Sequence, residues 1–163
     1  MDTGEDAWVK VQAERLVGSP VMCHDAVGTL QSSLTSIGSG RAFVTRRLRE
    51  WGVTDDDAAR ESVHHLLLVT SELLTNAVRA SSDELTIRLE AHHDRIAIAV
   101  TDDCPAPAEV VHAGPADEHG RGLYLVEALS RAWGQRFDGM LKTVWAEIAV
   151  PAGSALSVGC TVR

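Results

Sequence analysis

Long apolar runs and closely spaced cysteines are missing from this sequence. No apolar run approaches the roughly 18 residues that a membrane span needs, and the opening residues, MDTGEDAWVK, lack the apolar stretch of a signal peptide. The three cysteines, Cys23, Cys104 and Cys160, are far apart and show no CxxC spacing. We therefore expect neither a disulfide framework nor a zinc site, and no membrane association. These absences indicate a protein of the reducing cytoplasm.

Basic residues are also in short supply. The 163-residue chain has 15 Lys and Arg against 23 Asp and Glu, a net charge of −8. Binding to a phosphate backbone needs a concentrated basic surface, so we expect no direct contact with nucleic acid. The cluster RRLRE at 46–50 is interpreted as the solvated face of a helix rather than a docking patch. The length and the 45% hydrophobic content are typical of one globular domain.

The spacing of apolar residues predicts two helices, two strands, an irregular loop, a third helix and two more strands. An edge strand and a Ser/Gly-rich loop are expected within 21–40. The predicted helices span 41–51, 54–80 and 123–133, and the strands span 85–91, 96–102 and 134–150, the last range being divided at the Asp138-Gly139 turn. This order predicts an α+β fold, a two-layer sandwich with helices on one face of a mostly antiparallel sheet.

The boundaries follow from the same pattern. Residues 1–37 read as an N-terminal arm with a possible edge strand, residues 38–150 as the main domain, and residues 151–163 as a mobile tail. Gly52 is the expected end of the first helix, and Thr54 the expected cap of the second.

The long helix carries polar residues on its less apolar side, in SELLTNAVRAS at 71–81. Glu72 and Asn76 are one turn apart and project in the same direction. A solvent-exposed polar face explains them simply. However, Leu68 and Val69 border the same side, which predicts that it is partly covered. In a covered wall, an amide oxygen suits Mg²⁺ and a carboxylate can deprotonate a nucleophile.

Two further features place polar groups where they could bind a ligand: an aspartate at the end of a strand and a pair of glycines before a helix. Asp102 ends the strand 96–102 on the same side as its apolar residues, so it needs a donor: either the amine of a purine or a local turn through Cys104 and Pro105. Gly120 and Gly122 flank Arg121 at the entry to the third helix. That position either provides backbone amides to an anion or only shapes the turn.

Together, in this order, these three features resemble the Bergerat fold, the ATP-binding domain of the gyrase, Hsp90, histidine-kinase and MutL superfamily. Within it, the chain resembles the anti-sigma-factor serine/threonine-protein kinases over about residues 38–150. SELLTNAVRAS is similar to their N box, VTDDCPAP to their G1 box, HGRGLYLVEALSRAWG to their G2 box, and KTVWAEI, around Lys142 and Trp145, to their closing strand. Cys104 and Ala80 stand where this family often has glycine and histidine.

The resemblance implies ATP and Mg²⁺ as cofactors and assigns roles to residues. Glu72 would be the general base, Asn76 the Mg²⁺ ligand, and Asp102 the reader of the adenine amine. The other nucleotide-binding positions implied are Arg79, Gly120, Arg121, Gly122, Leu123 and Thr143. Residues 103–119 would form a lid over the nucleotide.

The implied function is a serine/threonine-protein kinase that regulates transcription by partner switching. It would phosphorylate an anti-sigma-factor antagonist of the STAS type, bind a sigma factor, and form a homodimer. One alternative is a non-catalytic ATP-binding module that sequesters a sigma factor or its antagonist. A histidine-kinase catalytic domain is a further alternative. It is disfavoured because no helix pair with a phospho-acceptor histidine precedes the domain, and His64 and His65 lie inside the N-box helix.

Overall fold

The computed structural model describes residues 22–53, 56–81, 83–109 and 121–156. Five strands form one sheet in the order β1-β2-β3-β5-β4, and every neighbouring pair is antiparallel. The strands are β1 (Met22–Gln31), β2 (Glu84–His92), β3 (Arg95–Asp102), β4 (Ala132–Asp138) and β5 (Leu141–Ala149). Strand β1 occupies the sheet edge, in the segment where an edge strand was expected. The prediction of an α+β fold with an antiparallel sheet is confirmed.

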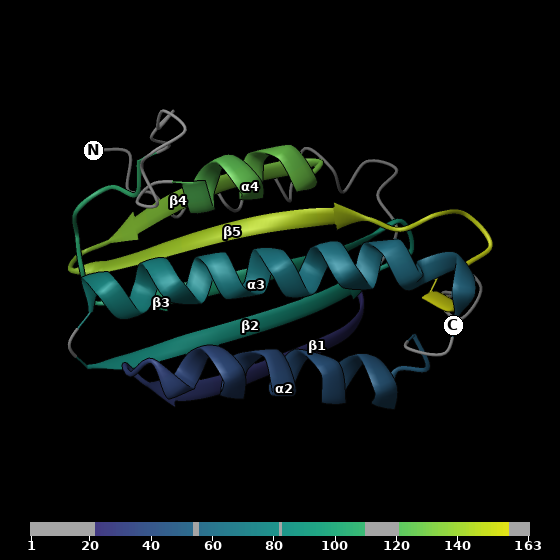
Figure 1. Ribbon diagram of the computed structural model, residues 1–163, viewed down its shortest axis with the longest axis horizontal. Coiled ribbons are helices and arrows are strands. Elements are labelled where there is room, and N and C mark those ends of the chain that lie inside the picture. The colour runs from purple at the N-terminus through teal and green to yellow at the C-terminus, as the bar shows by residue number, and fades with distance from the viewer. Residues whose placement is uncertain (1–21, 54–55, 82, 110–120, 157–163) are drawn as a thin grey trace.

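Three helices cover one face of this sheet (Figure 1). They are α2 (Thr35–Glu50), α3 (Arg60–Ala80) and α4 (Arg121–Leu129), and a short 3₁₀ helix, η1 (Asp57–Ala59), precedes α3. Helix α3 is central: it packs against α2 on one side, α4 on the other, and β3 and β5 beneath. The hydrophobic core lies between this layer and the alternate strand residues that face it, such as Ile96, Ile98, Val144 and Ile148.

The first helix begins earlier than the sequence predicted. Helix α2 starts at Thr35, inside the stretch expected to be a Ser/Gly-rich loop. One of its glycines has a packing reason, because Gly40 is buried and a Cβ there would lie 2.3 Å from Leu74 Cδ1. A residue without a side chain lets α2 approach α3 closely. The helix is followed by Gly52 with φ +74°, which confirms the predicted stop.

The other boundaries differ in smaller ways. Helix α3 begins at Arg60, and the Asp56 carboxylate accepts a hydrogen bond from the Ala58 amide before it; Thr54, the expected cap, lies outside the described residues. Helix α4 ends at Leu129 rather than 133, because β4 has already begun to pair with β5 at Ala132. The turn at Gly139, with φ +58°, joins β4 to β5 as predicted.

Two predictions about the periphery are wrong. Residues 151–156 are not a free tail, since Leu156 is buried in the core and Ser154 is fully buried; residues 157–163 lie outside the described range. Cys23 is disulfide-bonded, whereas Cys104 is a free thiol. Cysteine pairing depends on which sulfur atoms the fold brings together, and sequence spacing did not reveal that.

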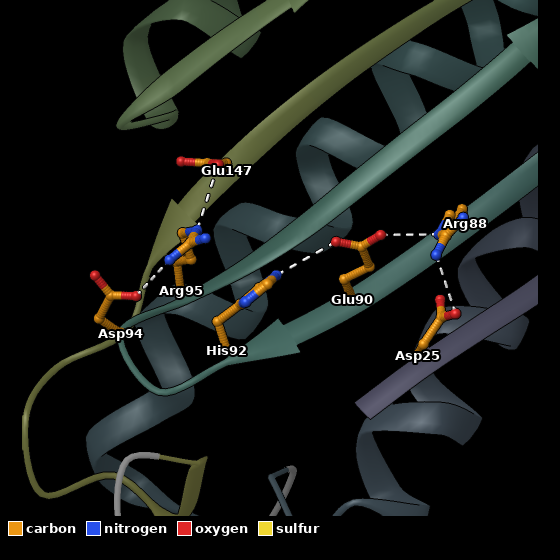
Figure 2. A network of polar contacts seen from close by, with 7 residues as sticks. All are labelled: Asp25, Arg88, Glu90, His92, Asp94, Arg95 and Glu147. Atoms are coloured by element: carbon orange, nitrogen blue, oxygen red, sulfur yellow. Dashed lines mark hydrogen bonds and ion pairs between the residues drawn. The ribbon is translucent and has the colours of Figure 1, made fainter. Parts of the chain in front are cut away.

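The sheet face away from the helices carries a chain of ion pairs (Figure 2). Glu90 in β2 is 5% exposed and lies between Arg88, at 2.8 Å from Nε, and His92, at 3.3 Å from Nε2. Arg88 also contacts Asp25 of β1 at 3.1 Å, tying the edge strand to the sheet. The hydrogen bond from His92, with the charge of Arg88, lowers the pKa of Glu90 below its usual 4.5, although burial opposes the shift.

This lowered pKa makes Glu90 a pH-dependent contributor to stability. A carboxyl group whose pKa is lower in the folded state stabilises the fold above its unfolded pKa, and the contribution is lost as the pH falls through the folded pKa. We therefore expect Glu90→Gln to lower the free energy of unfolding at pH 7 by about 1–2 kcal/mol. The deficit should shrink below pH 4.5. Urea unfolding across this pH range measures it, with Glu84→Gln, an exposed position on the same strand, as the control. A deficit that persists unchanged in acid would contradict the assignment.

Candidate nucleotide site

Helix α3 brings its polar residues to the end of the sheet where β3 stops. Near its start, Ser62 donates a hydrogen bond to the Ala149 carbonyl at 2.7 Å, and Ala149 pairs with Arg95 at the beginning of β3. From Ser62 to Asn76 the helix rises about 21 Å, and from Arg95 to Asp102 the strand advances about 23 Å. Helix α3 and the strands run side by side (Figure 1), so the two similar advances predict that Asn76 comes near the end of β3 that Asp102 occupies.

Glu72 and Asn76 are half-buried, as the mixed character of this side of the helix predicted. Helix α4 covers the Glu72 side chain. A Cβ built on Gly122, in the first turn of α4, would lie only 2.5 Å from Glu72 Oε2. The Glu72 carboxylate therefore rests directly against the backbone at the start of α4, where amides without helical partners favour negative charge.

The remaining G2-box residues are only partly visible. Gly120 lies outside the described residues, and Arg121 begins α4, although its side chain is not described. Leu123 is 3% exposed and its side chain belongs to the hydrophobic core. Only the backbone of Leu123 is therefore left to contact a ligand. Of the expected lid, the structure describes residues 103–109.

Asp102 ends β3 on the helix-covered face and is only 2% exposed. Its Oδ1 accepts a hydrogen bond from the Cys104 amide at 2.9 Å, the local turn that the sequence offered as one explanation. Its Oδ2 lies 3.4 Å from Lys142 Nζ. Burial raises the pKa of Asp102 above its usual value, although both the Cys104 amide and Lys142 act in the opposite direction.

Lys142 is the residue at this site that the sequence analysis missed. It was noted only as part of the closing strand, yet it is 4% exposed and pairs directly across the sheet with Asp102. Its Nζ also donates a hydrogen bond to the Ala106 carbonyl at 3.1 Å. The signal was present in the alternation of β5, because Lys142 shares its side of the strand with the apolar Val144.

One expected site residue, Thr143, is not brought to the others. Thr143 follows Lys142, so it points to the opposite face of the sheet, where its hydroxyl is 2.7 Å from that of Thr101. Strand alternation therefore places Lys142, not Thr143, on the side of α3. Arg79, in the last turn of α3, is exposed.

The residues at this end of the helix layer suit a magnesium nucleotide in their donor chemistry. Asn76 offers one amide oxygen, and Mg²⁺ commonly takes few protein ligands and keeps its waters; within the described ranges, no group of three or more His, Cys, Asp or Glu is placed to hold a metal. Gly122 leaves the start of α4 free of a side chain. Asp102 is the acceptor suited to an exocyclic amine, but its oxygens face Cys104 and Lys142.

A comparison with solved structures finds a similar fold. A crystal structure of the RsbU and RsbW domains of Rv1364c from Mycobacterium tuberculosis is similar in fold, with a TM-score of 0.57, 16% sequence identity, and coverage of 78% of this chain and 33% of that one. The chain thus spans about a third of the length of that protein. No curated protein matches the sequence.

In the part of the chain that the structure describes, no helix is both long and apolar enough to cross a membrane.

The sequence also matches a protein family. Residues 30–146, well over half of the chain, match the family described as the histidine kinase-like ATPase domain. That family has the ATP-binding fold that the N, G1 and G2 boxes predicted, and this chain belongs to it.

Proposed function

We propose that this protein binds ATP with Mg²⁺ and phosphorylates a serine or threonine of an anti-sigma-factor antagonist of the STAS type, regulating transcription by partner switching. The observation that carries the proposal is the half-buried Glu72 against the start of α4, with Asn76 one turn further along α3. The fold similarity to a structure that contains an RsbW domain supports it. Binding of a sigma factor and formation of a homodimer belong to the same proposal.

In this proposal each residue takes the role that the resemblance to the N, G1 and G2 boxes implies. The bound nucleotide would supply the phosphoryl group and its Mg²⁺ the charge that offsets the developing negative charge. Asn76 would hold the metal through its amide oxygen. The backbone at the start of α4, including Gly122, would face the phosphates, and Asp102 would accept a hydrogen bond from the adenine amine. Glu72 accepts the proton of the incoming hydroxyl group.

Two measurements test this proposal. In a calorimetric titration with Mg²⁺ present, we expect ATP and ADP to bind more tightly than GTP, since only adenine offers Asp102 an exocyclic amine at that edge. With radiolabelled ATP, we expect label on a serine or threonine of a STAS-type antagonist from the same organism. A preference for GTP would remove the role given to Asp102, and absence of nucleotide binding would refute the proposal.

A second candidate function has its own support. The Asp102 carboxylate already contacts Cys104 and Lys142, which favours a module that binds nucleotide weakly and uses it to set its shape. Such a module would hold a sigma factor or its antagonist without modifying it. The labelled-ATP experiment separates the two functions, since nucleotide binding without transfer to any antagonist supports the module.

Gly122 provides a test of the α3–α4 contact. Gly122→Ala would place a methyl carbon 2.5 Å from Glu72 Oε2, so the carboxylate must move. A displaced general base loses most of its contribution, and we expect phosphorylation of the antagonist to fall by about 10²-fold. Gly38→Ala is the control, because a Cβ at this other helical glycine would meet nothing within 4 Å. Equal activity of the two variants would contradict the placement of Glu72.

A further inference from the structure

At the end of the candidate site where the base is proposed to bind, the Asp102 carboxylate already faces the ammonium group of Lys142. Asp102 and Lys142 are 2% and 4% exposed, and they face each other across the β3–β5 pair with Nζ 3.4 Å from Oδ2. Asp102 Oδ1 is engaged with the Cys104 amide. Because Asp102 is also almost fully buried, a ligand that binds its carboxylate must move one of the groups that cover it.

Of the two donors, Lys142 is the one that a ligand can replace. The Cys104 amide is fixed by the turn that directly follows Asp102, whereas the lysine ammonium is carried on a flexible side chain. An adenine amine and an ammonium are both hydrogen-bond donors, so they compete for the same acceptor oxygen. The ammonium is charged, and a charge-assisted hydrogen bond is about twice as strong as a neutral one.

A second contact holds Lys142 in place. Its Nζ also donates to the Ala106 carbonyl, in the segment 103–109 that follows Asp102. This segment is anchored again at Ala108, whose amide and carbonyl are bonded to the side chain of Gln135 at 2.9 and 3.0 Å. The lysine is thus held between the Asp102 carboxylate and the Ala106 carbonyl, whereas Gln135 contacts the segment only at Ala108.

We propose that Lys142 is an internal competitor for the base-recognition carboxylate, so that adenine binds only by displacing the Lys142 ammonium from Asp102. This inference rests on the proposed nucleotide binding and specifies how the base is read. Lys142 thereby weakens adenine nucleotides selectively. A base that presents a carbonyl oxygen at the same edge offers no amine to Asp102, so it does not compete with Lys142 for that carboxylate.

The test compares ATP with inosine triphosphate, in which a carbonyl oxygen replaces the adenine amine and the phosphates are unchanged. Calorimetric titrations with Mg²⁺ give the dissociation constants for wild type, Lys142→Met and Lys142→Gln. We expect Lys142→Met to bind ATP about 10-fold more tightly than wild type, without tighter binding of inosine triphosphate. Lys142→Gln removes the charge but keeps a donor for Ala106, so a smaller gain is expected, and the test does not depend on one variant folding.

Gln135→Ala serves as the matched control, because it loosens the segment 103–109 at Ala108 without changing Asp102 or Lys142. Its ratio of ATP to inosine triphosphate affinity should equal that of wild type. If wild type binds ATP and neither Lys142 variant binds it more tightly, or if Gln135→Ala changes the ratio as Lys142→Met does, competition by Lys142 is refuted while nucleotide binding stands. If no form binds nucleotide, the proposed function itself fails.

Discussion

Glu72→Gln is expected to bind ATP with unchanged affinity and to phosphorylate its antagonist about 10²- to 10⁴-fold more slowly, the usual contribution of a general base. The substitution keeps the size and shape of the side chain against Gly122 but removes the negative charge that accepts a proton. Because Glu72 is half-buried under α4, bulk water is a poor substitute for it. Single-turnover transfer from radiolabelled ATP, alongside a binding titration, separates the chemical step from affinity.

The matched control for this experiment is Glu61→Gln on the same helix. The Glu61 side chain is 86% exposed and lies 3.9 Å from His65, well away from α4. We expect transfer at the wild-type rate from this variant. Transfer at the wild-type rate from Glu72→Gln as well would show that Glu72 is not the general base, and another group would have to accept the proton of the incoming hydroxyl.

Asp102→Ala is expected to give the largest loss of stability among these variants, about 3–5 kcal/mol in the free energy of unfolding at pH 7. The substitution leaves the Lys142 ammonium at 4% exposure without the carboxylate that faces it, and the Cys104 amide without its acceptor. An uncompensated buried charge costs more than the ion pair itself contributes, because the charge has been removed from water. Urea unfolding monitored by circular dichroism measures the difference.

The double variant Asp102→Ala/Lys142→Met tests the reason for this loss. When the stranded ammonium is also removed, much of the stability should return, and the two substitutions should be strongly non-additive. Asp103→Ala, at the neighbouring half-buried position, is the control and should change stability by about 0.5 kcal/mol or less. A loss below about 1 kcal/mol for Asp102→Ala would mean that the pair is solvated, contrary to the burial described.

Elements with local sequence signals were predicted correctly, and elements that depend on distant contacts were not. The strands β2 and β3 followed from strict alternation, and the β4–β5 turn from Asp138-Gly139, because both signals are local. The start of α2 was missed because the glycine at position 40 is explained by its close contact with Leu74, a residue 34 positions away in the chain. The packing of Leu156 in the core was missed for the same reason, and the spacing of the cysteines gave no signal for the disulfide at Cys23.

The sequence by itself determined the antiparallel α+β architecture and the identity of the polar residues, since apolar period and motif order are properties of the chain alone. Only the tertiary structure decided which of those residues meet. Packing of α4 on α3 placed Gly122 against Glu72, and the register of β3 with β5 put Lys142, rather than Thr143, beside Asp102. Register and helix packing are set by the fit of whole surfaces, and no single segment encodes that fit.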